Sequence, residues 1–238
     1  MHRTSRLGRL AALALAALTA CSDPVDVTDP IVVEFDLTLD QLSAWAIGSS
    51  DYLASQEAAV EFQAEKRALP DNLGGGPAFY HAGTNISDDL WMYFARQVQA
   101  FQPGATYRLG FQVHFATNQH SGCTVGTGPS VWIKAGASTE QPARLLSGDG
   151  SWRMNVDKGE QSQVGSAAVL LGDIRNGLPG CPSPPQYQAN VAGDPTETIA
   201  VTADDSGAIW LFFGTESGFE SRHEIYFTRF TVQATLQD

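Results

Sequence analysis

Regular alternation between apolar and polar residues constrains the fold of this chain more than any other feature. It is clearest in residues 106–117, TYRLGFQVHFAT, where every second side chain from Tyr107 to Phe115 is large and mainly apolar. A period of two places these side chains on one face of a β-strand, with Arg108, Gln112 and His114 on the other face. The pattern therefore predicts a strand that packs one side on a core.

Segments of similar character recur at 31–39, 60–62, 79–82, 90–98, 130–137, 151–156, 198–202, 208–214 and 224–235. Clusters of Gly and Pro separate several of them and supply the backbone conformations of tight turns. Only 56–67 and 85–99 also admit a helical interpretation. About ten strands with hardly any helix predict an all-β chain that folds as a single β-sandwich, in the form of a jelly roll.

The first 20 residues have the character of an export signal. Three arginines precede the apolar segment 10–20, LAALALAALTA. As a helix these residues reach about 16 Å, roughly half of a hydrocarbon core of about 30 Å, so the segment is a signal peptide and not a membrane span.

The end of this segment, Leu18-Thr19-Ala20-Cys21, resembles the lipobox of bacterial lipoproteins. The resemblance implies that the Cys21 thiol receives a diacylglycerol, becomes the new N-terminus and anchors the protein to a bilayer of the bacterial cell envelope. Ser22 follows where inner-membrane lipoproteins of enteric bacteria carry aspartate, which favours the outer membrane. The alternative is an ordinary cleavage site beside an incidental cysteine.

Residues 21–30 are predicted to form a short tether. The nine residues after Cys21, SDPVDVTDP, contain two prolines and three aspartates and cannot build a core. They span at most roughly 30 Å. The remaining residues, 31–238, show no repeat and no break in composition, so we expect one β-sandwich domain close to the membrane surface.

The charge balance excludes one class of partner. Removing residues 1–20 removes three arginines and no acid, which leaves 11 basic against 26 acidic side chains, a net charge of −15. Phosphate backbones repel such a chain, so nucleic acid is not an expected partner.

Cys123 and Cys181 remain as an even pair once Cys21 is assigned to lipid. In an oxidising compartment such a pair predicts a disulfide, worth roughly 4 kcal/mol for a loop of this length in the chain-entropy model. A metal pair is the alternative, although neither cysteine has a CxxC or CxxH neighbour.

Two segments carry a resemblance to a known group. Residues 101–111, FQPGATYRLGF, and 224–232, EIYFTRFTV, resemble a turn-and-strand and the final strand of galactose-binding-like jelly-roll carbohydrate-binding modules. The resemblance implies a jelly roll and sugar binding. The final strand of that group often carries an aspartate tied to a structural calcium, where this chain has Thr228.

Motifs of catalysis are sparse. The chain lacks GxSxG, HExxH, Walker A and GxGxxG signatures. Asp88 and Asp89 follow Asn85 in an oxygen-rich segment, which makes them candidate Ca²⁺ ligands. Further carboxylates cluster at 155–160 and 216–220, and the alternative for each cluster is a turn or cap role.

Polar and aromatic residues share the non-core side of several predicted strands. They are Trp91, Tyr93, Arg108, Gln112, His114, Trp132 and Lys134. Aromatic faces stack on sugars and the polar groups bond hydroxyls, so the set is typical of a carbohydrate groove. The alternative is that the aromatic strands are central and are covered by long loops.

These features favour non-enzymatic binding of a glycan or a similar polar ligand by a lipid-anchored module. Two alternatives stay open. One is an envelope scaffold or assembly lipoprotein that binds another protein. The other is a glycoside hydrolase that uses a carboxylate cluster, for example through Asp88 or Glu216.

Overall fold

The computed structural model describes residues 29–237. The signal peptide, Cys21 and most of the predicted tether lie outside these residues. The described part of the chain contains no helix with the length and apolar character that a membrane crossing requires.

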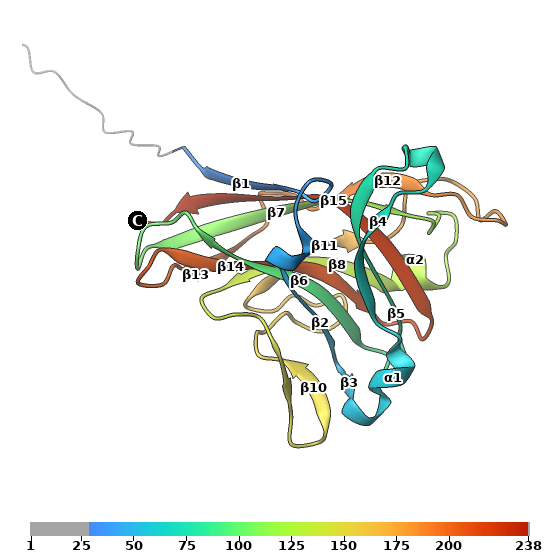
Figure 1. The fold of residues 1–238 in the computed structure, drawn as a ribbon, viewed down its shortest axis with the longest axis horizontal. Helices are drawn as coiled ribbons and strands as arrows, with labels where there is room; N and C mark the ends of the chain where they lie inside the picture. The colour runs from blue at the N-terminus through green and yellow to red at the C-terminus, as the bar shows by residue number, and fades with distance from the viewer. Residues whose placement is uncertain (1–28, 238) are drawn as a thin grey trace, which may run out of the picture.

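Two large antiparallel sheets and one small sheet make up the fold (Figure 1). The sheet that we call the β7 sheet contains β4 (Gln63–Ala68), β5 (Pro77–Thr84), β15 (Arg222–Leu236), β7 (Thr106–Thr117) and β12 (Gln188–Ala192), with β1 (Ile31–Asp36) also paired to β15 and β13 (Thr198–Thr202) to β7. The β14 sheet runs in the order β11 (Ala168–Asp173), β8 (Val131–Ser138), β14 (Ala208–Ser217), β6 (Leu90–Gln99) and β2 (Ala46–Ser50). The small sheet holds β3 (Tyr52–Leu53), β10 (Ser151–Met154) and β9 (Arg144–Leu146).

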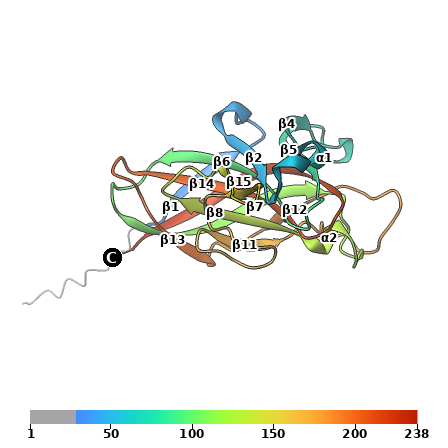
Figure 2. The same cartoon turned by 90° about the horizontal axis from the view of Figure 1, so that it is seen from below.

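Helices are short in the described residues. They are α1 (Glu57–Val60), α2 (Thr127–Ser130) and the 3-10 turns at Leu42–Ala44, Ala54–Gln56 and Asp71–Leu73. Figure 2 shows α1 and β4 on one side of the sandwich and β11 on the opposite side.

The two large sheets face each other across an aromatic core. Phe213 of β14 lies 5.1 Å from Phe227 and 4.7 Å from Phe230 of β15, measured between ring centroids. Leu109 and Phe111 of β7 belong to the same buried cluster, on the face that alternation predicts. The all-β sandwich of jelly-roll type is confirmed.

One local prediction was wrong, and one alternative is settled. Residues 60–62 do not form a strand, because Val60 ends α1 and Glu61 takes a left-handed conformation with φ of 48°. The strand predicted at 90–98 is confirmed as β6, between β14 and β2, and the helical alternative for 85–99 is wrong. The apolar residues of β6 are continuous because both of its faces are buried.

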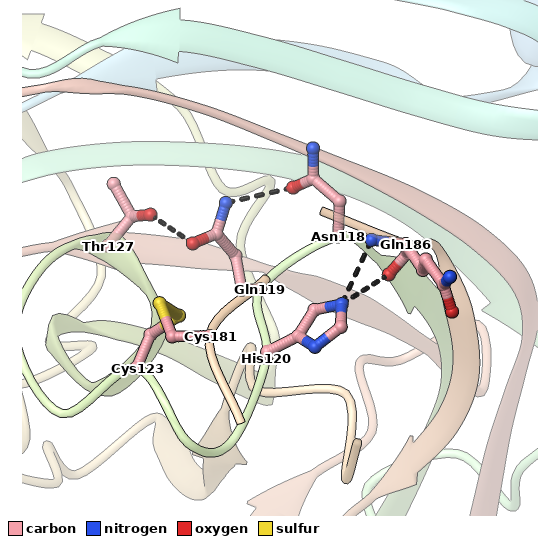
Figure 3. Close-up of a disulfide and its surroundings, with 7 residues drawn as sticks. All are labelled: Asn118, Gln119, His120, Cys123, Thr127, Cys181 and Gln186. Atoms are coloured by element: carbon pink, nitrogen blue, oxygen red, sulfur yellow. Dashed lines mark hydrogen bonds between the residues drawn. A yellow bond between two sulfur atoms is a disulfide. The ribbon is translucent and has the colours of Figure 1, made fainter. Parts of the chain in front are cut away.

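The disulfide between Cys123 and Cys181 is confirmed, with a Cα–Cα distance of 4.9 Å (Figure 3). It joins the loops that follow β7 and precede β12. His120 reinforces the junction, because its Nε2 accepts a hydrogen bond from the Gln186 backbone N–H at 2.9 Å. The loops approach so closely that a Cβ on Gly122 would lie 2.3 Å from the carbonyl oxygen of Gly180.

The outer faces of the two large sheets differ. Residues 139–167, which we call the covering segment, include the β9–β10 hairpin that projects beside β3 in Figure 1. Met154, Val156 and Ala167 of this segment pack on an aromatic cluster on the outer face of the β14 sheet. On the β7 sheet, Arg108, Arg229 and Gln233 are exposed.

Candidate functional site

The residues predicted to line one ligand groove lie on opposite sides of the molecule. Arg108, Gln112 and His114 alternate with core residues of β7 and therefore point outward from the β7 sheet. The other four belong to the β14 sheet, on β6 (Trp91, Tyr93) and β8 (Trp132, Lys134). The prediction of one groove lined by all seven is wrong, because the core separates the two groups.

Three of the four residues on the β14 sheet are inaccessible to a ligand. Trp91 and Lys134 are 0% exposed and Tyr93 is 4% exposed. The covering segment buries them, as the alternative interpretation of the sequence expected. Trp132 is half-buried, and its ring lies 2.9 Å from the place a Cβ on Gly218 would take, so it packs along that backbone.

Half-buried and exposed polar side chains form an array on the outer side of the β7 sheet, which we call the open face, and the Pro195 backbone lies against Gly110 within it. Strand register places Thr231 of β15 beside Gln112, Arg229 beside His114, and Gln233 beside Gly110. Gln112 and His114 are half-buried, whereas Arg108 is exposed. Within residues 29–237 the side chains of Gln112, Thr231 and Gln233 enter no hydrogen bond with the protein, so their donors and acceptors are free for a ligand.

Charges on the open face are few and mixed. Arg229 lies 3.7 Å from Glu34 of β1, and Arg108 donates to the Thr198 hydroxyl at 3.3 Å. Burial, followed by the nearby Arg229, lowers the pKa of His114. Its imidazole is therefore neutral at neutral pH and can both donate and accept one hydrogen bond.

The other end of the same outer face is closed by tyrosines. Tyr80 donates to Glu224 at 2.7 Å, and Tyr187, from the stretch just before β12, donates to the second oxygen of Glu224. Burial, followed by the hydrogen bond to Glu224, raises the pKa of Tyr80 to about 12. Sequence reasoning missed this cluster because no local spacing links residues so far apart in the chain.

A polar cleft of about 430 Å³ opens at the edge of the β14 sheet. It lies between the β2–β3 junction, the β5–β6 loop, β10 and the covering segment. Its lining includes Asp51, Asp88, Asp89, Arg153 and Gln161.

A buried ionic cluster adjoins this cleft and shares Asp51 and Asp89 with its lining. Asp51, Asp89 and Glu216 each offer an oxygen within 4.8 Å of the others. Glu216 is fully buried and receives the Lys134 ammonium at 2.5 Å and the Lys158 ammonium at its other oxygen. Lys158 also lies 3.2 Å from Asp51.

Titration within the cluster is strongly perturbed. Burial, followed by a hydrogen bond with Glu216, raises the pKa of Asp89 to about 8, although Lys158 acts in the opposite direction. Burial also lowers the pKa of Lys134, against the attraction of Glu216. Asp89 is therefore mostly protonated at neutral pH.

The cluster does not fit the calcium site predicted at Asp88 and Asp89. Asp88 is exposed with φ of 63° and does not belong to the group of converging carboxylates. Both oxygens of Glu216 are engaged by ammonium groups, whereas Ca²⁺ takes six to eight oxygen ligands. The lysines already supply the positive charge that a cation would bring.

Other predicted carboxylates have structural roles. Asp157 accepts hydrogen bonds from the backbone N–H groups of Gly159 and Ser166, at 3.1 and 2.8 Å, which is the turn role given as the alternative. Glu220 is exposed, while Glu216 is locked between two ammonium groups. This pairing leaves Glu216 without the free oxygen that a hydrolytic acid or base needs.

Comparisons with known proteins give no family. No protein-family model matches the chain, and no curated protein matches it. Among solved structures, the carbohydrate-binding module TmCBM27, described in a study of mannan recognition, aligns with 88% of this chain and 99% of its own, at 9% identity and a TM-score of 0.38. A putative sugar-binding protein from Bacteroides thetaiotaomicron aligns with 83% and 91%, at 8% identity and a TM-score of 0.36.

The enzymatically active domain of tailspike protein 4 from bacteriophage CBA120 aligns with 84% of this chain at 11% identity and a TM-score of 0.33, and the chain spans only 20% of that protein. Similarity of this size carries no argument about activity or ligand.

Proposed function

We propose that this protein binds a hydroxyl-rich ligand, a carbohydrate, on the open face of the β7 sheet, without catalysis. The single observation that carries the proposal is the set of unengaged polar side chains on adjacent strands there, centred on Gln112 and Thr231. Neighbouring strands lie about 4.8 Å apart and same-face residues about 6.6–7 Å apart along a strand. This grid suits the successive hydroxyls of an extended oligosaccharide.

The chemistry of the open face supports a neutral polyol over a charged ligand. Gln112 and Gln233 each offer an amide donor and acceptor, and neutral His114 offers one of each. Glu34 balances the charge of Arg229. A rigid sheet also reduces the entropy lost when a ligand orders the side chains that contact it.

We further propose that the protein is exported and carries lipid on Cys21, with residues 21–30 as a tether to the domain and with the outer membrane as its location. The lipobox-like sequence and the disulfide, which requires an oxidising compartment, support this proposal. Intact-mass analysis of membrane-extracted protein should reveal a diacylglyceryl modification in the native chain and none in Cys21→Ser.

Titration calorimetry of the full chain against a panel of neutral, acidic and amino oligosaccharides tests the binding proposal. We expect a neutral oligosaccharide to bind, and Gln112→Ala and Arg108→Ala each to weaken it roughly tenfold, equivalent to about 1.4 kcal/mol. Gln97→Ala, an exposed glutamine of β6 on the other sheet, is the matched control and should leave affinity unchanged. Absence of binding across the panel, or equal losses in the control, would overturn the proposal.

A further inference from the structure

Strand β2 forms one edge of the β14 sheet, and its free side is unprotected. Within residues 29–237 this strand pairs with β6 alone. Its sequence, AIGSS, contains no charged residue and no proline, and its register with β6 is continuous. Charges, prolines and bulges are the features that commonly keep the free N–H and C=O groups of an edge strand from pairing with another extended chain.

Two other edge strands of the sandwich do have such protection. At the opposite edge of the same sheet, β11 contains a bulge between Leu170 and Gly172, and the Leu171 carbonyl accepts a hydrogen bond from the Gly193 N–H at 3.1 Å. On the β7 sheet, the edge strand β4 has three charged residues in its sequence QAEKRA. The edge at β2 lacks both kinds of protection, so a further strand can pair with it.

A pocket of about 380 Å³, which we call the edge pocket, adjoins Ile47, Gly48 and Ser49 of β2. Its other walls come from α1, from Phe62 just after α1, and from Arg144 of β9. Among the described residues, β6 contributes none to this lining, which places the pocket on the free side of β2. The unpaired strand edge therefore borders open space, with apolar groups beside it.

The charges around the edge pocket favour a basic ligand. Arg144 is already paired with Glu57, at 2.7 Å. Glu61 is 65% exposed, and its ion pair with Arg222 is 3.7 Å long, so a cation of a ligand can also reach it. Two copies of this chain joined edge to edge would bring the glutamates of both together. Repulsion between them disfavours a second copy as the occupant.

We propose that the β2 edge is a docking site for an extended basic peptide of a partner protein, which adds a strand to the β14 sheet. Main-chain hydrogen bonds to β2 hold such a peptide, and pockets beside the strand select its side chains. The length of β2 accommodates about five paired residues, or about 17 Å. An apolar side chain of the peptide packs beside Ile47 and Phe62, and a basic one pairs with Glu61. The site is on the other sheet from the open face, so it does not depend on the proposed carbohydrate.

A nitrogen-15 NMR titration of the full chain with synthetic peptides tests the docking site. The probe is a peptide of alternating valine and threonine with lysine at both ends. It should shift the amide signals of residues 47–49 and leave those of β11, the other edge of the sheet, in place. The same peptide with glutamate at both ends should bind about tenfold more weakly, because its charges repel Glu57 and Glu61.

Methylation of single backbone nitrogens of the lysine peptide distinguishes strand pairing from attraction between charges. In a paired strand the N–H groups point alternately toward the neighbouring strand and away from it. Methyl groups at alternate positions should therefore weaken binding by about tenfold or more, because each removes a hydrogen bond to β2. Methyl groups at the positions between them should change the affinity little.

Charge reversal on the protein gives a second test. Glu61→Lys should weaken binding of the lysine peptide about tenfold and strengthen binding of the glutamate peptide. Glu140→Lys, the same change at an exposed glutamate after β8, is the matched control and should leave both affinities unchanged.

Three results with the native chain would each overturn the proposal, whether or not the variants fold. One is the absence of shifts in β2 with the lysine peptide. Another is equal affinity for the lysine and glutamate peptides. The third is a methylation effect that does not alternate along the peptide. Shifts in β2 that depend on protein concentration without any peptide would identify a second copy as the occupant and would also overturn it.

Discussion

The outer faces of the two large sheets carry different side chains and lie in different surroundings. On β7 the residues that alternate with the core are Arg108, Gln112 and His114, and they reach solvent. On β6 they are Trp91 and Tyr93, and they are buried. Alternation identifies the side of a strand that packs on the core. The opposite side is exposed to solvent only if no other segment covers it.

The difference extends to the polar groups. On the open face, amides and a neutral imidazole face water at little cost. Beneath the covering segment, Lys134 and Glu216 are both 0% exposed, and burial of such charges is tolerated only when each has a partner. Substitutions on the open face should therefore cost little stability, whereas substitutions on the covered face break ion pairs between buried charges.

The largest expected effect comes from breaking that pairing. Glu216→Ala leaves the Lys134 and Lys158 ammonium groups buried without their carboxylate, and should reduce the free energy of unfolding by about 3–5 kcal/mol. Urea denaturation followed by tryptophan fluorescence measures the loss. Glu220→Ala, an exposed glutamate four residues further on, is the control and should change stability by less than about 0.5 kcal/mol.

Equal losses in the two glutamate variants would show that burial does not separate these residues. The proposed difference between buried, paired carboxylates and exposed carboxylates would then be wrong.

Two histidines on neighbouring strands, one buried and one half-buried, should differ in how they make stability depend on pH. His223 of β15 is buried with its Nε2 3.1 Å from the Thr215 hydroxyl, and burial lowers its pKa to about 3. The unfolded chain regains a value near 6.5 and so binds more protons between pH 3 and 6.5. Stability from His223 is therefore present above pH 6.5 and is lost as pH falls, by about 3 kcal/mol at pH 4.5.

The variant His223→Gln separates this contribution from that of groups that do not interact with His223, such as Asp89, which change the stability of both proteins alike. The difference in unfolding free energy between native chain and variant should shrink as pH falls from 7.5 to 4.5. His114→Gln on the open face should show a much smaller change. A difference that is constant with pH for His223→Gln would contradict its burial as a neutral imidazole.

The sequence was sufficient for features that depend on local pattern or on parity. Alternation predicted β7 with its core face, and the even count after Cys21 predicted the Cys123–Cys181 bond. It was insufficient for features that depend on distant segments. Asp51, Asp89 and Glu216 come from three separate parts of the chain, and no sequence spacing predicts that they lie close together.

The same limit explains the misplaced ligand residues. The sequence groups Trp91 and Lys134 with Arg108 because all three lie opposite a predicted core face. Their separation depends on which sheet each strand joins and on whether residues 139–167 fold over it. Neither fact can be inferred from the sequence of one strand, because strand pairing and burial by another segment both depend on contacts between residues far apart in the chain.

The smallest expected effect is the most direct test of the open face. Gln112→Ala and Thr231→Ala remove neighbouring side chains that no other group of the described protein engages, so each should change the free energy of unfolding by less than about 0.5 kcal/mol. Phe111→Ala, the adjacent core position on the same strand, should cost about 3–5 kcal/mol. Urea denaturation of the three variants would separate the two sides of β7. A decrease of more than about 1.5 kcal/mol in the free energy of unfolding of Gln112→Ala would mean that Gln112 contributes to packing. A lower ligand affinity of this variant could then not be attributed to a lost contact between Gln112 and the ligand.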